Sequence, residues 1–322
     1  MSRKERLCCF VVLALGLLAG QSIAPPASAE KLRVGKAVGG AFPFIFVDVG
    51  QRNGIFRKHG FELEISAFGG GPRVVQAMTS DSIDIGLNSG IDLVLSIKGA
   101  PVRGIASIAT RPLDLGIVVR PDLAATSAAD LKGKKISSNS PTALTAWTVR
   151  EVSRQQGWGP NGIEVVTMLS QAAWPLLKTR EIDGISTDLG NAMMGEKRGA
   201  GRVLVRYNEI IRDVQVYHVS ATDKIIRDRP DLVKAFLAGW LESLAFARAN
   251  KDKFVSVAVQ VTHHDADVIE AIYDPMMPLM TFDGKFSPKA IEALAQSYLD
   301  LKLLDSVPDM TPLYTERFLP GS

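Results

Sequence analysis

Short apolar runs typical of strands alternate with helix-like stretches along almost the whole chain, and this alternation constrains the fold more than any other feature. The expected strands span residues 32–38, 61–65, 83–87, 102–108, 115–119, 135–137, 163–168, 182–186 and 214–220. The expected helices span residues 44–52, 91–97, 142–156, 172–178, 230–249, 254–261, 266–273 and 288–301, with one more that begins at Pro72. Strands that alternate with helices pair in parallel through crossover connections, so the sequence predicts an α/β fold.

This alternation of expected strands and helices occurs in two successive stretches of the chain. Residues 81–85 and 180–184 stand at corresponding points, each after a helix of similar length. A chain of 322 residues is long enough for about two domains of ordinary size. Because no Ser/Gly linker separates the two stretches, we expect two similar α/β lobes that are joined by strand crossovers.

Residues 1–29 have the pattern of a cleaved export signal. Arg3, Lys4 and Arg6 precede an apolar run over residues 7–20, and Ala27-Ser28-Ala29 is a small-x-small motif that predicts cleavage after Ala29. A membrane anchor is the alternative, but a bilayer requires about 20 apolar residues and this run is shorter. We therefore expect an exported, periplasmic protein.

Charge and cysteine content exclude several classes of protein. The formal net charge is +3, and removal of residues 1–29 lowers it to +1 because they carry three basic residues and Glu5. A near-neutral chain without a basic block is not expected to bind nucleic acid. Cys8 and Cys9 are the only cysteines and precede the apolar run, so they are not lipoprotein acylation sites. The mature chain is therefore expected to lack thiol nucleophiles and thiolate metal sites.

The sequence contains no recognisable catalytic motif. It has no G-x-S-x-G elbow, no G-x-x-x-x-G-K-[ST] loop and no H-E-x-x-H pair. His263 and His264 with Asp265 and Asp267 are either a metal cluster or the cap of a helix, and the cap is favoured because adjacent histidines point in different directions. We predict no catalytic residues, no metal and no cofactor. A hydrolase that uses a pair of carboxylates stays open, although no spacing singles out such a pair.

Several turns follow expected strands at their carboxyl ends, where open parallel sheets bind ligands. They are residues 39–43, 69–72, 88–90, 139–142 and 188–191. Each leads toward a helix N-terminus, whose free N–H groups favour a polar or anionic group. Arg111, which follows another strand, is a candidate to bind a carboxylate or sulfonate, with a surface ion pair as the alternative.

An ordered series of motifs resembles a known family. Residues 54–65 resemble the G-x-F-x-x-x-G-L-x-V-E stretch of periplasmic substrate-binding proteins of ABC transporters. The match is to the branch that binds aliphatic sulfonates, taurine, nitrate and thiamine-pyrimidine precursors. Further matches follow in order at residues 76–78, 83–86, 98–102, 130–136, 182–183 and 229–233. Asp81 and Arg180 depart from this pattern because they stand where the family usually has glycine.

The resemblance implies a two-lobed fold of the type II periplasmic-binding class. Each lobe would be a mostly parallel sheet flanked by helices, with a ligand cleft between the lobes. Residues 30–112 and 213–322 would form lobe one, and residues 113–212 lobe two. The candidate ligand-binding residues are Phe42, Gly70, Gly71, Asn88 and Ser89 from lobe one and Ser140, Thr142 and Asp188 from lobe two. Core packing is the alternative for Phe42, a plain turn for the glycines, and helix capping for Ser140, Thr142 and Asp188.

The expected function is capture of a small solute that resembles a sulfonate, a carboxylate or a pyrimidine. The lobes would close over the solute, and the closed form would deliver it to the permease of an ABC importer. We expect a monomer that is not an enzyme. Two alternatives stay open: a periplasmic enzyme on the same fold, and a sensory module that presents its ligand to a receptor.

Overall fold

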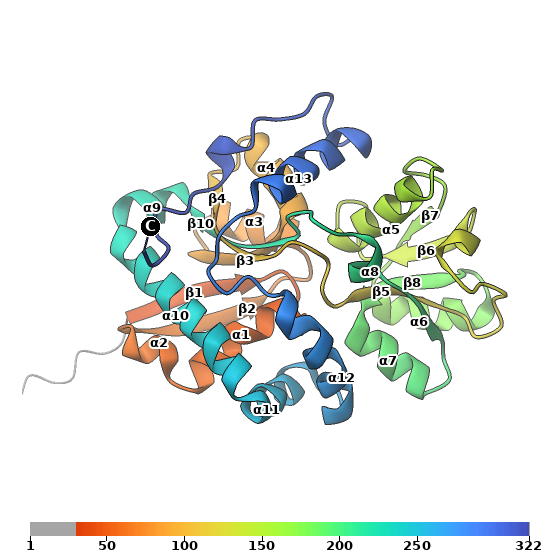
Figure 1. Cartoon of the computed structure of the whole chain (residues 1–322), viewed down its shortest axis with the longest axis horizontal. Coiled ribbons are helices and arrows are strands. Elements are labelled where there is room, and N and C mark those ends of the chain that lie inside the picture. The colour runs from red at the N-terminus through yellow and green to blue at the C-terminus, as the bar shows by residue number, and fades with distance from the viewer. Residues whose placement is uncertain (1–29, 322) are drawn as a thin grey trace, which may run out of the picture. The chain divides into compact units, whose positions relative to one another are not determined.

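Two five-stranded sheets form the framework of residues 30–321, which the computed structural model describes (Figure 1). The predicted export signal lies outside these residues. The first sheet has the order β2 (Phe61–Ala67), β1 (Glu30–Lys36), β3 (Ile85–Ser89), β10 (Tyr217–Thr222) and β4 (Val102–Ala109). The second has the order β7 (Glu164–Thr167), β6 (Lys135–Ser138), β8 (Gly184–Asp188), β5 (Leu115–Val119) and β9 (Arg202–Arg206).

Each sheet contains one antiparallel strand, which the chain enters directly from the other sheet. In the first sheet β1 and β3 are parallel, whereas β10 runs antiparallel to both β3 and β4. In the second sheet β6 is parallel to β7 and β8, whereas β5 runs antiparallel to β8 and β9. An antiparallel strand begins at the edge where its parallel neighbours end. The segments that lead into β5 and β10 therefore lie at the carboxyl-terminal edges of the parallel strands.

Thirteen α-helices flank these sheets within the described residues. They are α1 (Phe42–Arg52), α2 (Ile55–Lys58), α3 (Gly71–Thr79), α4 (Leu93–Ile97), α5 (Leu144–Gln155), α6 (Ser170–Thr179), α7 (Leu189–Lys197), α8 (Tyr207–Ile210), α9 (Asp223–Asp228), α10 (Pro230–Ala249), α11 (Lys251–Thr262), α12 (Ala266–Met276) and α13 (Pro288–Asp300). Helix α3 packs on β3 and β10, and α5 and α6 pack on β6 and β8. None of the helices within residues 30–321 is long and apolar enough to cross a membrane. The predicted α/β class with helix-flanked sheets is confirmed, and the lobe boundaries stay a prediction.

The aromatic core beside the first sheet joins early and late helices. Phe46 on α1 packs against Phe254 on α11, with ring centroids 5.2 Å apart. It also meets Trp240 on α10 edge-on, at 6.3 Å. All three side chains are fully buried. This cluster explains why α10 and α11, late in the chain, lie against α1.

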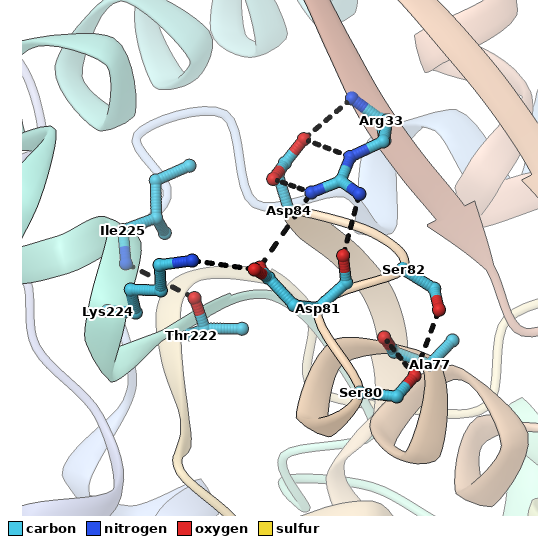
Figure 2. Close-up of polar contacts among 9 residues, drawn as sticks. All are labelled: Arg33, Ala77, Ser80, Asp81, Ser82, Asp84, Thr222, Lys224 and Ile225. Atoms are coloured by element: carbon cyan, nitrogen blue, oxygen red, sulfur yellow. Dashed lines mark hydrogen bonds and ion pairs between the residues drawn. The ribbon is translucent and has the colours of Figure 1, made fainter.

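Strand β3 begins two residues later than predicted because a polar cluster precedes it. The Arg33 guanidinium donates hydrogen bonds to both carboxylate oxygens of Asp84, and the Arg33 backbone N–H donates another (Figure 2). Asp81 accepts a 2.6 Å hydrogen bond from Lys224 Nζ, which holds the pKa of that carboxyl below its usual range. Asp84 therefore ties the start of β3 to β1.

The second sheet repeats this arrangement before β8, which also begins two residues later than predicted. Asp183 accepts a 3.0 Å hydrogen bond from the Lys135 N–H of β6, as Asp84 does from Arg33 of β1. Asp81 and Arg180 both have left-handed backbones, with φ of 59° and 67°. Glycine adopts this conformation without strain, which explains the glycine usual there in the family that the chain resembles.

One buried histidine in the first sheet should make stability depend on pH. His218 on β10 is buried, and burial lowers its pKa to about 3. Because the unfolded chain binds a proton near pH 6.5 and the native chain does not, this contribution to stability is lost as the pH falls below 6.5. Between pH 7 and pH 4.5 the loss amounts to about 2–3 kcal/mol.

The variant His218→Leu should lack this loss. The free energy of unfolding of both proteins, measured with urea at pH 7 and pH 4.5, checks this. The difference between variant and wild type should shift in favour of the variant at pH 4.5. Other titrating groups are common to both proteins, so equal pH dependence would contradict the assignment.

Candidate functional site

The largest concentration of predicted ligand-binding turns surrounds one pocket, which encloses about 660 Å³ of space that is partly open to solvent. Residues from both halves of the chain line it, and we call it the inter-sheet pocket. From the first sheet and its turns they are Ala37, Val38, Ala41, Phe44, Gly69, Gly70, Gly71, Ser89 and Tyr217, and from the second and its crossover they are Asp114, Leu115, Asn139, Ala143, Leu144, Thr145, Thr187 and Asp188.

Strand direction explains why these residues meet. Ser89 and Asp188 end the parallel strands β3 and β8, so both lie at a carboxyl-terminal edge. Tyr217 begins the antiparallel strand β10, and Asp114 directly precedes the antiparallel strand β5. The crossovers that lead into β5 and β10 run side by side, because the Val214 N–H donates to the carbonyl of Thr110 at 3.0 Å. The pocket therefore lies where both sheet edges and both crossovers come together.

Asp114 is the most perturbed carboxyl group in the pocket. Its side chain is 3% exposed, and Oδ2 accepts a 2.6 Å hydrogen bond from the N–H of Phe42 at the start of α1. Oδ1 accepts a longer hydrogen bond, 3.4 Å, from the Tyr217 hydroxyl. Burial, and then the charge of Asp188, raise the pKa of Asp114 to about 7. This carboxyl therefore changes its charge near neutral pH.

Asp188 is both a helix cap and a pocket residue. Its Oδ1 accepts a 2.8 Å hydrogen bond from the Asn191 N–H, which caps the first turn of α7. Burial raises the pKa of Asp188, but His264 and the donors of Asn191 lower it by more, so the net shift is downward. The Nε2 atom of His264 lies 3.8 Å from Oδ1. Asp188 is therefore ionised at neutral pH.

Four of the eight predicted ligand-binding residues line the inter-sheet pocket: Gly70, Gly71, Ser89 and Asp188. The Ser89 hydroxyl is already engaged, because it donates to Asp92 Oδ2 at 2.6 Å. Gly71 begins α3, and a Cβ atom at this position would overlap the Asp92 carboxyl group. The glycine is therefore needed for close approach of α3 to the end of β3.

The other four predicted residues do not line this pocket. The ring of Phe42 packs in the core against Phe46 and Phe254. Only its backbone N–H contributes to the site, because it donates a hydrogen bond to Asp114. The side chain of Asn88 is fully buried and donates to Ser220 Oγ at 2.6 Å. Ser140 and Thr142 lie outside the pocket, and Thr142, which is exposed, lines a neighbouring one.

Neither Ser140 nor Thr142 caps α5, because the residue before this helix is Ala143 and no side chain caps it. Arg111 does not line the pocket either. It lies near Asp213, whose pKa its charge helps to lower after the larger effects of Lys289. His263 and His264 belong to no group of three ligands that could hold a metal ion within residues 30–321.

Asp114 and Tyr217 are the polar pocket residues from the crossovers, and the sequence did not predict them. They lie 103 residues apart and enter through the crossovers, not through the turns that follow parallel strands. One available signal was an aspartate between Leu113 and Leu115, where an apolar run enters an expected strand. An acidic residue inside such a run is costly to bury unless the site uses it.

The geometry at Gly71 gives a prediction about stability. Gly71→Ala would force the new methyl group into the buried Asp92 carboxyl, so we expect a loss of about 1–3 kcal/mol in the free energy of unfolding. Gly39→Ala is the matched control, because its Cβ atom would meet only the Ala67 Cβ, at 3.2 Å. Urea unfolding of both variants checks this. Equal midpoints for Gly71→Ala and wild type would contradict the proposed close approach.

Comparisons with known proteins agree with the motifs in the sequence. The NMT1/THI5 like family model matches residues 42–253. No curated protein matches the chain. The alkanesulfonate-binding protein SsuA from Xanthomonas axonopodis pv. citri, bound to MOPS, is similar with a TM-score of 0.75 and 17% identity, over 91% of this chain and 99% of that chain.

Two further solved structures share the fold. The periplasmic aliphatic sulphonate binding protein SsuA from Escherichia coli has a TM-score of 0.74 and 18% identity, over 91% of this chain and 93% of that chain. The desulfurization enzyme DSZB has a TM-score of 0.65 and 14% identity, over 90% of this chain and 97% of that chain. The predicted periplasmic-binding fold is therefore confirmed. The same fold carries binding proteins and an enzyme.

Proposed function

This chain belongs to the NMT1/THI5-like family, and on that premise we propose that it is a periplasmic solute-binding protein that delivers a small solute to the permease of an ABC importer. The observation that carries the proposal is the inter-sheet pocket, which residues of both sheets line at their carboxyl-terminal edges. Export through the predicted signal is part of this proposal. N-terminal sequencing of protein recovered from the periplasm should give Glu30 as the first residue.

The proposed mechanism is capture followed by closure. A solute in the pocket would contact Ser89 and Tyr217 from the first sheet and Asp188 from the second. Because it interacts with both sheets only when they are close together, it favours the closed arrangement. The paired crossovers before β5 and β10 would serve as the hinge, since they carry the chain between the sheets.

The likeness to the desulfurization enzyme DSZB makes an enzyme the second candidate. The described lining contains no cysteine, histidine, lysine or arginine, so Asp114 and Asp188 would be the groups available for acid–base chemistry in such an enzyme. Incubation of any bound solute with the protein, followed by mass spectrometry, separates the two functions. Unchanged solute supports binding, whereas turnover supports the enzyme.

A thermal-shift screen of chemically diverse small solutes tests the proposed function. A ligand at about 100 times its Kd should stabilise the folded protein by about 2.7 kcal/mol. We expect at least one solute to raise the Tm and to lose this effect when Asp188 is replaced. If no solute of any charge raises the Tm, the solute-binding function is wrong.

A further inference from the structure

The charge of the inter-sheet pocket indicates which solutes it accepts. Resting on the proposed function, we propose that the pocket selects a small organic cation, an ammonium or amidinium group on a short apolar body, and rejects sulfonates and carboxylates. The pocket itself locates the site, and its two carboxylates determine the charge of the ligand. Three features support this selection: the partners of these carboxylates, the apolar lining and the positions of the basic groups.

The hydrogen-bond donors that surround the two carboxylates in the described structure are neutral. Asp114 accepts from a backbone N–H and from the Tyr217 hydroxyl. Asp188 accepts from the backbone and amide N–H groups of Asn191 and, at 3.3 Å, from the Thr187 hydroxyl. A carboxylate has about four lone-pair positions, so each retains capacity for another donor. The charge of Asp114 therefore has no cationic partner in direct contact within residues 30–321.

His264 is the one basic group close to this pair within the described residues. Its Nε2 atom is 3.8 Å from Asp188 Oδ1, beyond hydrogen-bond distance. It does not line the inter-sheet pocket but a smaller neighbouring cavity, which Asp114 and Asp188 also line. Even a protonated His264 would balance only one of the two carboxylates. The pocket therefore keeps a net negative charge once Asp114 is ionised.

Other basic side chains near the pocket do not line it: Arg73 lies beside Gly69, and Lys36 and Arg150 are directed to different partners. Lys36 is buried, and its Nζ forms a 2.7 Å ion pair with Asp48. Arg150 lines the adjacent pocket and donates to the Pro141 carbonyl at 2.7 Å. The helix N-termini that would favour an anion are already occupied at α1 and α7, because Asp114 accepts from the Phe42 N–H and Asp188 from the Asn191 N–H. An anion in the inter-sheet pocket would thus face two carboxylates, and no cation of the described lining offsets the repulsion.

The remaining lining fits the body of such a cation. Phe44, Leu115 and Leu144 supply apolar surface, and Tyr217 adds an aromatic ring beside Asp114. Apolar walls with a few charged groups are the usual composition of a small-molecule site. This arrangement differs in charge from what the printed names of the SsuA proteins, alkanesulfonate-binding and aliphatic sulphonate binding, say of those proteins.

Probes of matched shape and different charge test the inference. Thermal shift at pH 8 and low salt compares benzamidine with benzoate and benzenesulfonate, and butylamine with butyrate and butanesulfonate. At least one cation should raise the Tm, and none of the anions should. Calorimetry should then show at least tenfold weaker binding of that cation to Asp114→Asn and Asp188→Asn. The control Asp81→Asn removes an exposed carboxylate at the opposite end of β3 and should bind as wild type does.

Two results would overturn the inference and leave the proposed function intact. One is an anion that binds as tightly as its matched cation. The other is a neutral solute that raises the Tm while every cation fails to do so. Failure of all solutes, whatever their charge, would overturn both the inference and the proposed function.

Discussion

Replacement of Asp114 by asparagine should stabilise the protein at pH 8 and weaken its binding of organic cations at least tenfold. The pKa of Asp114 is raised to about 7 by burial and by Asp188, so the native state resists its ionisation. In the unfolded chain this group ionises near pH 4. Its stabilising contribution is therefore complete below pH 4 and is lost as the pH rises through 7. The loss reaches about 4 kcal/mol at pH 8.

The asparagine side chain of this variant carries no charge, so the variant avoids this loss. Its Tm should exceed that of wild type at pH 8, and the advantage should disappear at pH 4, where both side chains are neutral. The Kd of a bound cation at pH 8 should rise at least tenfold, which corresponds to about 1.4 kcal/mol. Differential scanning calorimetry at both pH values measures the first effect, and titration calorimetry measures the second.

Asp81→Asn is again the matched control for charge. Its side chain is exposed and pairs with Lys224, so this variant should change neither quantity appreciably. A lower Tm for Asp114→Asn at pH 8, with cation binding retained, would contradict the role assigned to Asp114.

Truncation of Trp240 should have the largest effect on stability outside the pocket. Trp240 on α10 is fully buried against Phe46 of α1, and its Nε1 donor has no hydrogen-bond partner within the described residues. Trp240→Ala should lower the free energy of unfolding by about 3–5 kcal/mol through lost burial and the cavity left behind. Urea unfolding at pH 7 measures this.

Trp240→Phe is the informative companion variant. It keeps an aromatic ring and removes the unpaired N–H, so it should lose less than about 2 kcal/mol. Neither variant should change ligand affinity in the folded protein, because Trp240 does not line the inter-sheet pocket. Equal losses for the two variants would show that the ring packing assigned to this position is wrong.

The order of strands and helices was largely predictable from the sequence, because apolar periodicity decides which segments are buried. The predicted boundaries of residues 115–119 and 230–249 agree with β5 and α10. The short helices α2, α8 and α9 were not predicted, no range was predicted for α7, and β9 was also missed. Strand β9 is Arg-Val-Leu-Val-Arg, and only Val205 within it is buried, so its apolar signal is weak.

Strand direction was less predictable than strand position. Alternation of strands and helices predicts parallel pairing, yet β5 and β10 are antiparallel to their neighbours. Both strands follow crossovers between the sheets instead of a helix that returns to the same sheet. Local periodicity carries no information about which sheet a strand joins, because that choice depends on contacts between distant segments.

The residues of the candidate site also divide into those that a local rule predicted and those whose place depends on strand direction. Gly70, Gly71, Ser89 and Asp188 belong to turns or strand ends next to parallel strands, where a local rule applies. Asp114 and Tyr217 enter through the crossovers, so their place in the pocket depends on strand direction. Asn88 was a candidate one residue away from Ser89, but successive side chains of a strand point to opposite faces, and that of Asn88 is turned into the core.

Proton release on cation binding tests the central claim most directly. Titration calorimetry of the bound cation at pH 7, in two buffers of different ionisation enthalpy, gives the number of protons exchanged. A cation that draws Asp114 into its ionised form should release about half a proton per site at pH 7 and almost none at pH 9, since the pKa of Asp114 is about 7. Asp114→Asn should release none, even with His264, Asp188 and Tyr217 unchanged. Tight binding with proton uptake, or with the same release in Asp114→Asn, would contradict an acidic pocket built to hold a cation.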